Sequence, residues 1–272
     1  MRRLHTPHPT ALERMNTAEL REQFLVANLF VPGQVQLVNT GLDRLIVGSA
    51  VPQNTLTLPN PEALRSSFFH ERRETGVLNI GCPGTLVADG VSFVLGSMEC
   101  AYIGRGTREV SFQNGEAGQA EFYLLSCPAH REYPTRRAGI SEAESELIGS
   151  AEKASGRTIY RYIHQQGMGS CQLTMGFTAL DAGSVWNTWP PHVHDRRSEV
   201  YLYLTGGGLL LHLLGEPDQS RHLIVRDKQA VLSPSWSMHC GAGESAYRFV
   251  WGMAGENQSF EDMDRVDLTA LR

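Results

Sequence analysis

The sequence predicts a mainly β protein built as a duplicated β-barrel, with a few short helices at its periphery. Short runs rich in β-branched and aromatic residues recur between residues 74 and 127 and again between residues 157 and 251. Glycine, asparagine and aspartate interrupt these runs every ~8–12 residues, a spacing typical of sandwiches and barrels. The two blocks share this pattern, which indicates a weak internal duplication.

The first quarter of the chain mixes helices and strands. Asn16 precedes the apolar-periodic run Ala18–Leu25 and has Glu19 three residues after it, so a capping box is expected to start a helix here. Asn60-Pro61 predicts a second short helix through Phe69, because proline suits the first helical position. Strands are expected over Gly33–Asp43 and Arg44–Gly48.

Two blocks of strands follow, separated by a linker. In the first block we expect strands at Gly76–Ile80, Gly84–Val87, Val91–Leu95, Cys100–Ile103, Glu109–Phe112 and Ala120–Leu125. In the second we expect strands at Arg157–Ile163, Cys171–Phe177, Val200–Leu204, Leu209–Leu214, His222–Val225, Gln229–Leu232 and Ala246–Trp251. Between them, Ser141 to Glu144 predicts the cap of a linking helix that extends to about Lys153. This divides the chain into a domain of residues 1–150 and a domain of residues 151–272.

Composition narrows the class of protein. The chain has 272 residues, 41% hydrophobic and 19% charged, as expected for a globular protein that buries a large core. A net charge of −5 argues against nucleic-acid binding, because no basic excess is present to neutralise phosphates. No apolar run reaches the ~18 residues of a membrane span, and the N-terminus lacks a secretory signal. The odd, widely spaced cysteines indicate a reduced cytoplasmic protein.

One constellation points to chemistry: His192, His194, Glu199 and, after Pro234, His239. Two histidines at i and i+2 of an extended segment point to the same face. A turn after His194 would return the Glu199 carboxylate to that side, and folding must deliver His239. Three imidazoles and a carboxylate favour a borderline divalent metal, zinc above all, with manganese, iron or nickel as alternatives.

These residues extend beyond a lone His-x-His pair, which is more often only a pair of surface or core histidines. The spacing His-x-His-x4-Glu-x6-Gly, ending at Gly206, and the block Val231–His239 resemble the two motifs of the cupin superfamily. The second block departs from the pattern at Trp236, where glycine is usual, and at Gly243, where asparagine is usual. Because the first β block lacks this ligand set, we expect an N-terminal barrel that is degenerate, and one metal per chain.

A longer resemblance covers nearly the whole chain. Residues 183–204, which contain the histidine pair and the glutamate, resemble the 5-keto-4-deoxyuronate isomerase family, also called 4-deoxy-L-threo-5-hexosulose-uronate ketol-isomerases. Supporting stretches lie at residues 71–81, 122–135, 170–176 and 255–264.

The resemblance implies a cytoplasmic enzyme of pectin and uronate breakdown. It implies the aldose–ketose isomerisation of 5-dehydro-4-deoxy-D-glucuronate to 3-deoxy-D-glycero-2,5-hexodiulosonate. It also implies zinc on His192, His194, Glu199 and His239, a small sugar-acid substrate, and a homo-oligomer, usually a hexamer. The charge and the lack of a long apolar run lead us to expect no nucleic-acid or membrane partner.

The reaction requires a base and a cation for the substrate carboxylate. Base candidates without a metal role are Glu244, Glu256 and His164, and no single residue is assigned. For the carboxylate, a bidentate arginine is the natural partner. The arginine candidates are Arg161, Arg197 and Arg248, with Arg196 beside the ligands. Trp186, Trp189 and Trp236 flank the ligands and either wall the sugar or pack the barrel.

Three alternatives stay open at this point. The 5-deoxy-glucuronate isomerase of inositol breakdown shares the expected fold and ligand set. An iron-dependent cupin dioxygenase would use the same ligands for different chemistry. A sensing or storage cupin is disfavoured, because such proteins often lose ligands and no DNA-binding helix pair is evident in this chain.

Overall fold

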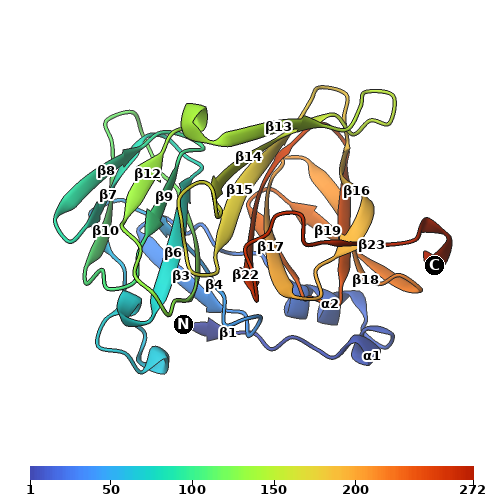
Figure 1. Ribbon diagram of the computed structural model, residues 1–272, viewed down its shortest axis with the longest axis horizontal. Helices are drawn as coiled ribbons and strands as arrows, with labels where there is room; N and C mark the ends of the chain where they lie inside the picture. Colours follow the sequence, from blue (N-terminus) through green and yellow to red (C-terminus); the bar gives the residue numbers. More distant parts are fainter. The chain divides into compact units, whose positions relative to one another are not determined.

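The computed structural model describes residues 1–272 and consists mainly of β-strands (Figure 1). The chain forms two compact units. Unit 1 contains Met1–Leu4, Asn28–Glu144 and Tyr162–Met175, and unit 2 contains His5–Ala27, Ser145–Arg161 and Gly176–Arg272. The duplicated cupin-type fold expected from the sequence is confirmed. The units depart from a simple division at residue 150, because residues 5–27 belong to unit 2 and residues 162–175 to unit 1.

Unit 1 contains two sheets. The larger has the order β1 (Arg2–Arg3), β3 (Gln34–Asn39), β4 (Ile46–Val51), β11 (Phe122–Pro128), β6 (Arg73–Asn79), β9 (Cys100–Ile103) and β12 (Arg136–Ala138). The smaller has the order β5 (Leu56–Thr57), β10 (Val110–Asn114), β7 (Gly84–Ala88) and β8 (Val91–Leu95). Apolar side chains from both sheets, such as Val77 and Leu124 of the larger and Leu86 and Phe112 of the smaller, form one buried core. This burial is the main favourable term that holds the two sheets together.

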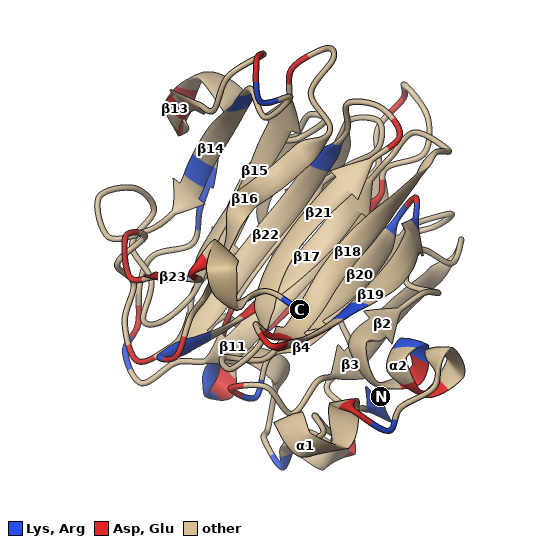
Figure 2. Ribbon diagram, turned by 90° about the vertical axis from the view of Figure 1, so that its right-hand side faces the viewer, with Lys and Arg blue, Asp and Glu red and all other residues tan.

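Unit 2 repeats this plan. One sheet has the order β13 (Glu144–Ile148), β14 (Arg157–Ile163), β15 (Thr174–Leu180), β22 (Arg248–Gly255), β17 (Arg197–Leu204), β20 (Gln229–Ser233) and β2 (Leu25–Val26). The other has the order β19 (Gln219–Arg226), β18 (Leu209–Glu216), β21 (Met238–Gly243), β16 (Trp186–Val193) and β23 (Asp264–Arg265). Most charged residues lie at strand ends and in loops, and the strands themselves are largely uncharged (Figure 2).

Two N-terminal helices, α1 (Pro9–Leu12) and α2 (Thr17–Phe24), belong to unit 2 (Figure 1). The capping box at α2 is confirmed: Asn16 Oδ1 accepts from the Glu19 amide at 3.1 Å, and the Glu19 carboxylate accepts from the Asn16 amide at 2.8 Å. Leu20 and Phe24 of α2 enter the core of unit 2. The Arg221 guanidinium of β19 donates to backbone carbonyls at the end of α1, including that of Leu12 at 3.1 Å. These contacts explain why the helices join the C-terminal barrel.

Two helix predictions are wrong. Residues 141–153 form a 3-10 turn at Ile140–Glu142 and then the strand β13. The Glu142 carboxylate accepts from the Gly139 amide at 2.8 Å, so the observed cap lies two residues before the expected Ser141 and starts a single turn. The exposed, acidic β13 is an edge strand, where charge discourages pairing with another chain.

The expected helix over residues 60–69 is replaced by two separate 3-10 turns, Glu62–Leu64 and Phe69–Glu71. Arg65 ends the first turn with a left-handed backbone, φ +49°. The Asn60 side chain donates to the Ser66 carbonyl at 2.7 Å and closes the loop. Hydrogen bonding by Asn60 to nearby backbone thus competes successfully with helix propagation. No helix in the chain has the length and apolar character needed to cross a membrane.

Candidate metal centre

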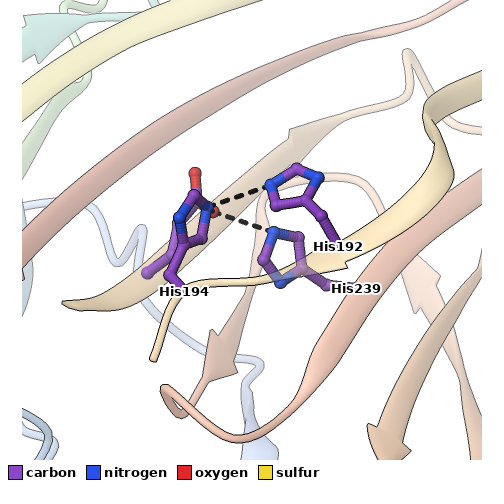
Figure 3. Close-up of side chains that lie close together, drawn as sticks. His192, His194 and His239 are labelled. Atoms are coloured by element: carbon purple, nitrogen blue, oxygen red, sulfur yellow. Dashed lines mark hydrogen bonds and ion pairs between the residues drawn. The ribbon is translucent and has the colours of Figure 1, made fainter. Parts of the chain in front are cut away.

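Four side chains converge inside unit 2: His192, His194, Glu199 and His239. Figure 3 shows the three histidine rings lying close together. The ligand atoms of the four residues all lie within 4.8 Å of one another. His194, Glu199 and His239 are buried and His192 is half-buried. The structure therefore brings together all four residues that the sequence nominated, and this is a potential metal site.

The strand pairing explains how distant residues meet. His192 of β16 and His239 of β21 are direct cross-strand partners, and their ring centroids lie 4.6 Å apart. A register shift in β16 between Asn187 and His192 changes the facing of the strand just before the ligands. His194 follows the strand end, and its carbonyl accepts from the Arg197 amide at 2.9 Å, closing a turn. This turn starts β17, which places Glu199 beside the histidines as expected.

The donor atoms are spaced as if around one ion. His192 Nε2 lies 3.0 Å from His194 Nε2, and Glu199 Oε2 lies 3.1 Å from His194 Nε2 and 3.0 Å from His239 Nε2. Donors bonded to one cation at ~2.1 Å are separated by roughly 3.0–3.4 Å when they are neighbours. Glu199 Oε2 and His239 Nε2 are buried and make no hydrogen bond. Buried polar atoms without partners are costly, and a cation between these atoms would satisfy them.

The hydrogen-bond partners of His194 and His239 determine which nitrogen of each ring carries the proton. His194 Nδ1 lies 2.9 Å from the Asp262 carbonyl, which only accepts, so Nδ1 carries the proton and Nε2 keeps its lone pair. His239 Nδ1 lies 2.9 Å from Ser233 Oγ and 3.4 Å from the Ser237 carbonyl, which assigns the same tautomer. Such outer partners orient metal-binding imidazoles. Both rings therefore present Nε2 to the centre.

The charge states also suit a cation. Burial, reinforced by His239 and His194, lowers the pKa of His192 to about 2, so its ring is neutral. A neutral imidazole and an ionised carboxylate are the forms that bind metal.

The two departures from the cupin motif have local explanations. Trp236 is not among the residues with positive φ, so no glycine is needed at its turn. A Cβ on Gly243 would lie 2.7 Å from the Tyr247 ring, so this position requires glycine for space. The departures leave the candidate ligand His239 on β21.

A cavity of about 270 Å³ opens beside the four donors. His192, His194 and Glu199 form part of its wall, and Thr188 and Tyr201 add hydroxyl groups. The Tyr201 hydroxyl is hydrogen-bonded to Glu199 and Thr188. The remaining wall is largely apolar and includes Ile148, Ile159, Trp189, Pro190, Phe249, Trp251, Met253, Phe260 and Met263. A mostly apolar cavity with a few convergent polar groups is typical of a small-molecule site.

None of the three arginines nominated for the substrate carboxylate lines this cavity. Arg161 forms an ion pair with Glu146 at 2.7 Å and lies over the Phe260 ring. Arg197 is buried and donates to the Asp262 carbonyl at 2.6 Å, behind His194. Arg248 is exposed at the start of β22.

The base candidates Glu244, Glu256 and His164 are also absent from the cavity wall. The Glu244 carboxylate accepts from the Leu209 amide at 3.3 Å, and His164 Nε2 lies 3.4 Å from Glu144. Of the three tryptophans, Trp189 lines the cavity. Trp186 packs on Trp189, and Trp236 packs edge-on against Phe24.

Sequence reasoning missed most of the lining residues, including the polar Arg157, Tyr201 and Arg265. Tyr201 carried a usable signal, because it lies two residues after Glu199 on the same strand and so shares its face. Arg157 carried a weaker one, its position in the expected strand 157–163. Arg265 lies in the two-residue strand β23, whose pairing with β16 no local pattern indicates.

The fold and this centre together define a duplicated cupin with one histidine–glutamate site in its C-terminal barrel. The chain belongs to the KduI/IolB family, whose model matches residues 43–270. A 4-deoxy-L-threo-5-hexosulose-uronate ketol-isomerase of Opitutus terrae is 49% identical over 271 residues, covering 98% of each chain.

Solved structures support the fold. An IolB-like protein from Salmonella typhimurium superposes with a TM-score of 0.74 at 17% identity, covering 89% of this chain and 96% of the other. Bacillus subtilis oxalate decarboxylase, described with Mn(II) centres, gives a TM-score of 0.60 at 13% identity and covers 88% and 80%.

Proposed function

We propose that the chain is a metal-dependent ketol-isomerase that converts 5-dehydro-4-deoxy-D-glucuronate to 3-deoxy-D-glycero-2,5-hexodiulosonate. Support comes from a 4-deoxy-L-threo-5-hexosulose-uronate ketol-isomerase that is 49% identical over 98% of this chain. The single observation that carries the proposal is the convergence of His192, His194, Glu199 and His239 at one centre, the first three of which also line a cavity. This gives a reactive centre and a space for a small sugar acid in the same barrel.

We infer that the four donors hold one divalent cation, with zinc as the expected ion and manganese, iron or nickel as alternatives. Nitrogen-rich ligand sets with one carboxylate favour these ions over calcium or magnesium. A cation held there supplies Lewis-acid polarisation of a carbonyl and lowers the pKa of neighbouring C–H and O–H groups.

The residues of the chain then have separate tasks. Isomerisation removes the proton at C2 of the open-chain sugar acid and returns a proton at C1. Apolar walls, including Ile159, Phe249 and Trp251, exclude bulk water from this exchange. Burial raises the pKa of Tyr201 well above its usual range, so its hydroxyl stays protonated and donates a hydrogen bond beside Glu199.

A direct assay tests this proposal against its alternatives. Zinc-loaded enzyme is incubated separately with 5-dehydro-4-deoxy-D-glucuronate and 5-deoxy-D-glucuronate, and products are identified by NMR while dissolved oxygen is recorded. We expect turnover of the first substrate and no oxygen uptake. Preferential turnover of the second substrate would support the inositol-pathway isomerase, and oxygen consumption by iron-loaded protein would support a dioxygenase.

We also propose that the protein is cytoplasmic and assembles as a homo-hexamer. All five cysteines are free thiols, which suits a reducing compartment. The hexamer rests on the family resemblance, and light scattering coupled to size-exclusion chromatography measures it directly.

A further inference from the structure

The cavity beside the metal centre contains an uncompensated positive charge. Its wall includes two arginines, Arg157 and Arg265, but one carboxylate, Glu199, which already faces His194 and His239. Neither arginine makes an ion pair with an acidic side chain. The Arg157 guanidinium is half-buried, and without a counter-charge this burial is costly unless a ligand supplies one, whereas Arg265 is exposed at the rim.

The other arginines near the centre are already engaged. Arg161 pairs with Glu146, Arg196 pairs with Asp262 and Asp264, and Arg197 donates to the Asp262 carbonyl. Arg157 and Arg265 therefore differ from their neighbours both in facing the cavity and in lacking an acidic partner. This arrangement is expected for arginines that bind an anionic ligand.

The strands aim both side chains at the cavity. Arg157 and Ile159 alternate along β14 and both line it, as residues i and i+2 of a strand do. Arg265 of β23 is the cross-strand partner of His192 of β16, which places the two side chains on the same face. A ligand that contacts the metal centre thus lies within a space that the two arginines also border.

The hydrogen bonding of Arg157 leaves its bidentate edge free. Nη1 donates to the Ser155 carbonyl at 2.7 Å, which fixes the guanidinium plane. Nε and Nη2 have no partner in the protein and form the edge that matches the two oxygens of a carboxylate. Such a pre-oriented fork loses little conformational entropy on binding.

We propose that Arg157, assisted by Arg265 at the cavity wall, binds the carboxylate of the uronate substrate and so selects acidic over neutral sugars. This inference rests on the proposed function, because it places the carboxylate of the proposed substrate, the end remote from C1 and C2, against the two arginines. It deepens that function by naming the specificity residues, which differ from those nominated from the sequence.

The test uses two stable ligands that differ at one group, the charged carboxylate of D-glucuronate and the neutral amide of D-glucuronamide. Their binding to zinc-loaded wild-type protein and to Arg157→Gln, Arg157→Lys and Arg265→Gln is measured by calorimetry. Arg226→Gln, at an exposed position of β19 outside the cavity wall, is the matched control for loss of one positive charge. Bound zinc and thermal unfolding are recorded for every variant to verify folding.

We expect wild-type protein and Arg226→Gln to prefer glucuronate over glucuronamide. In Arg157→Gln this preference should fall by about 10- to 100-fold, because charge-assisted hydrogen bonds are lost, while zinc content is unchanged. Arg157→Lys should retain charge but lose most of the bidentate preference, and Arg265→Gln should show a smaller loss. Should Arg157→Gln fail to fold, the lysine variant and Arg265→Gln decide the question.

An unchanged preference in the folded Arg157 and Arg265 variants, or no preference in wild-type protein, would overturn the assignment. Because binding needs no turnover, this outcome is separate from failure of the proposed reaction. A protein that discriminates glucuronate through Arg157 but does not isomerise the sugar acid would retain the carboxylate site and refute the activity alone.

Discussion

His192 and His239 face each other across the β16–β21 ladder as direct cross-strand partners, with ring centroids 4.6 Å apart. The register of the β16–β21 pairing therefore determines the positions of two of the four candidate ligands. A one-residue slip would send one imidazole to the opposite face of the sheet. The turn from His194 into β17 then adds Glu199, so three strands contribute to a single centre.

Removal of one ligand should abolish metal binding. In His194→Ala, Glu199 Oε2 loses a neighbour at 3.1 Å and the donor set falls to three. We expect metal affinity to drop by more than about 100-fold, beyond the effect usual for outer-sphere changes, with activity lost in parallel. Elemental analysis of dialysed protein measures this. His222→Ala, on the exposed side of β19, is the control, and full metal retention by His194→Ala would refute the ligand assignment.

An outer-sphere change should weaken the centre without destroying it. Ser233→Ala removes the hydroxyl 2.9 Å from His239 Nδ1, and the Ser237 carbonyl at 3.4 Å is a poorer substitute. We expect a loss of about 10- to 100-fold in metal affinity. Competition with a chromogenic chelator measures the affinity, with Ser92→Ala on exposed β8 as control. Equal affinities in the two variants would show that Ser233 does not orient the ring.

Tyr201→Phe separates catalysis from metal retention. The substitution keeps the ring that packs on Phe249 and removes the hydroxyl bonded to Glu199 and Thr188. We expect kcat to fall by about 10- to 100-fold, within the range of one hydrogen-bonding group in an active site, while bound metal stays near the wild-type level. Steady-state kinetics on metal-matched samples tests this. A kcat in Tyr201→Phe equal to that of the wild-type protein would show that the Tyr201 hydroxyl takes no part in the reaction.

Buried His70 in unit 1 should make stability depend on pH. Burial, with a contribution from the charge of Arg73, lowers the pKa of His70 from 6.5 to about 3. Its neutral ring is bonded to Thr75 at 2.8 Å. Below pH ~6.5 the unfolded chain binds a proton that the folded chain does not, so this stabilisation is present above pH 6.5 and declines as pH falls toward 3.

His70→Gln should therefore flatten the pH dependence of the free energy of unfolding by up to ~1.4 kcal/mol per pH unit in that window. Urea unfolding at pH 7.0, 6.0 and 5.0 measures it, with exposed His5→Gln as control. A slope unchanged from wild type in His70→Gln would contradict the buried neutral state.

Much of this architecture was predictable because it depends on local patterns. Alternating apolar runs identified most strands, and the Asn16–Glu19 box located α2. The same type of signal at Ser141–Glu144 failed, because the cap that forms is Gly139 with Glu142 and starts only one turn. Glu144 already belongs to β13, and pairing of β13 with β14 determined the outcome. Capping energies of about 1 kcal/mol are easily outweighed by sheet formation.

The candidate site divides in the same way. Its four donors were predictable from spacing and residue type, because few other reasons bring three histidines and a glutamate into this pattern. Arg157 and Arg265 were not, since their nomination needs the register of β14 and β23 against the rest of the barrel. The exchange of residues 5–27 and 162–175 between units depends on long-range packing, which no local motif records.

The most direct measurement is the metal content of purified wild-type protein together with the effect of its removal. The account predicts about one divalent ion per chain, loss of ketol-isomerase activity after chelation, and recovery on adding one equivalent of zinc. Full activity in protein shown by elemental analysis to be metal-free would contradict it.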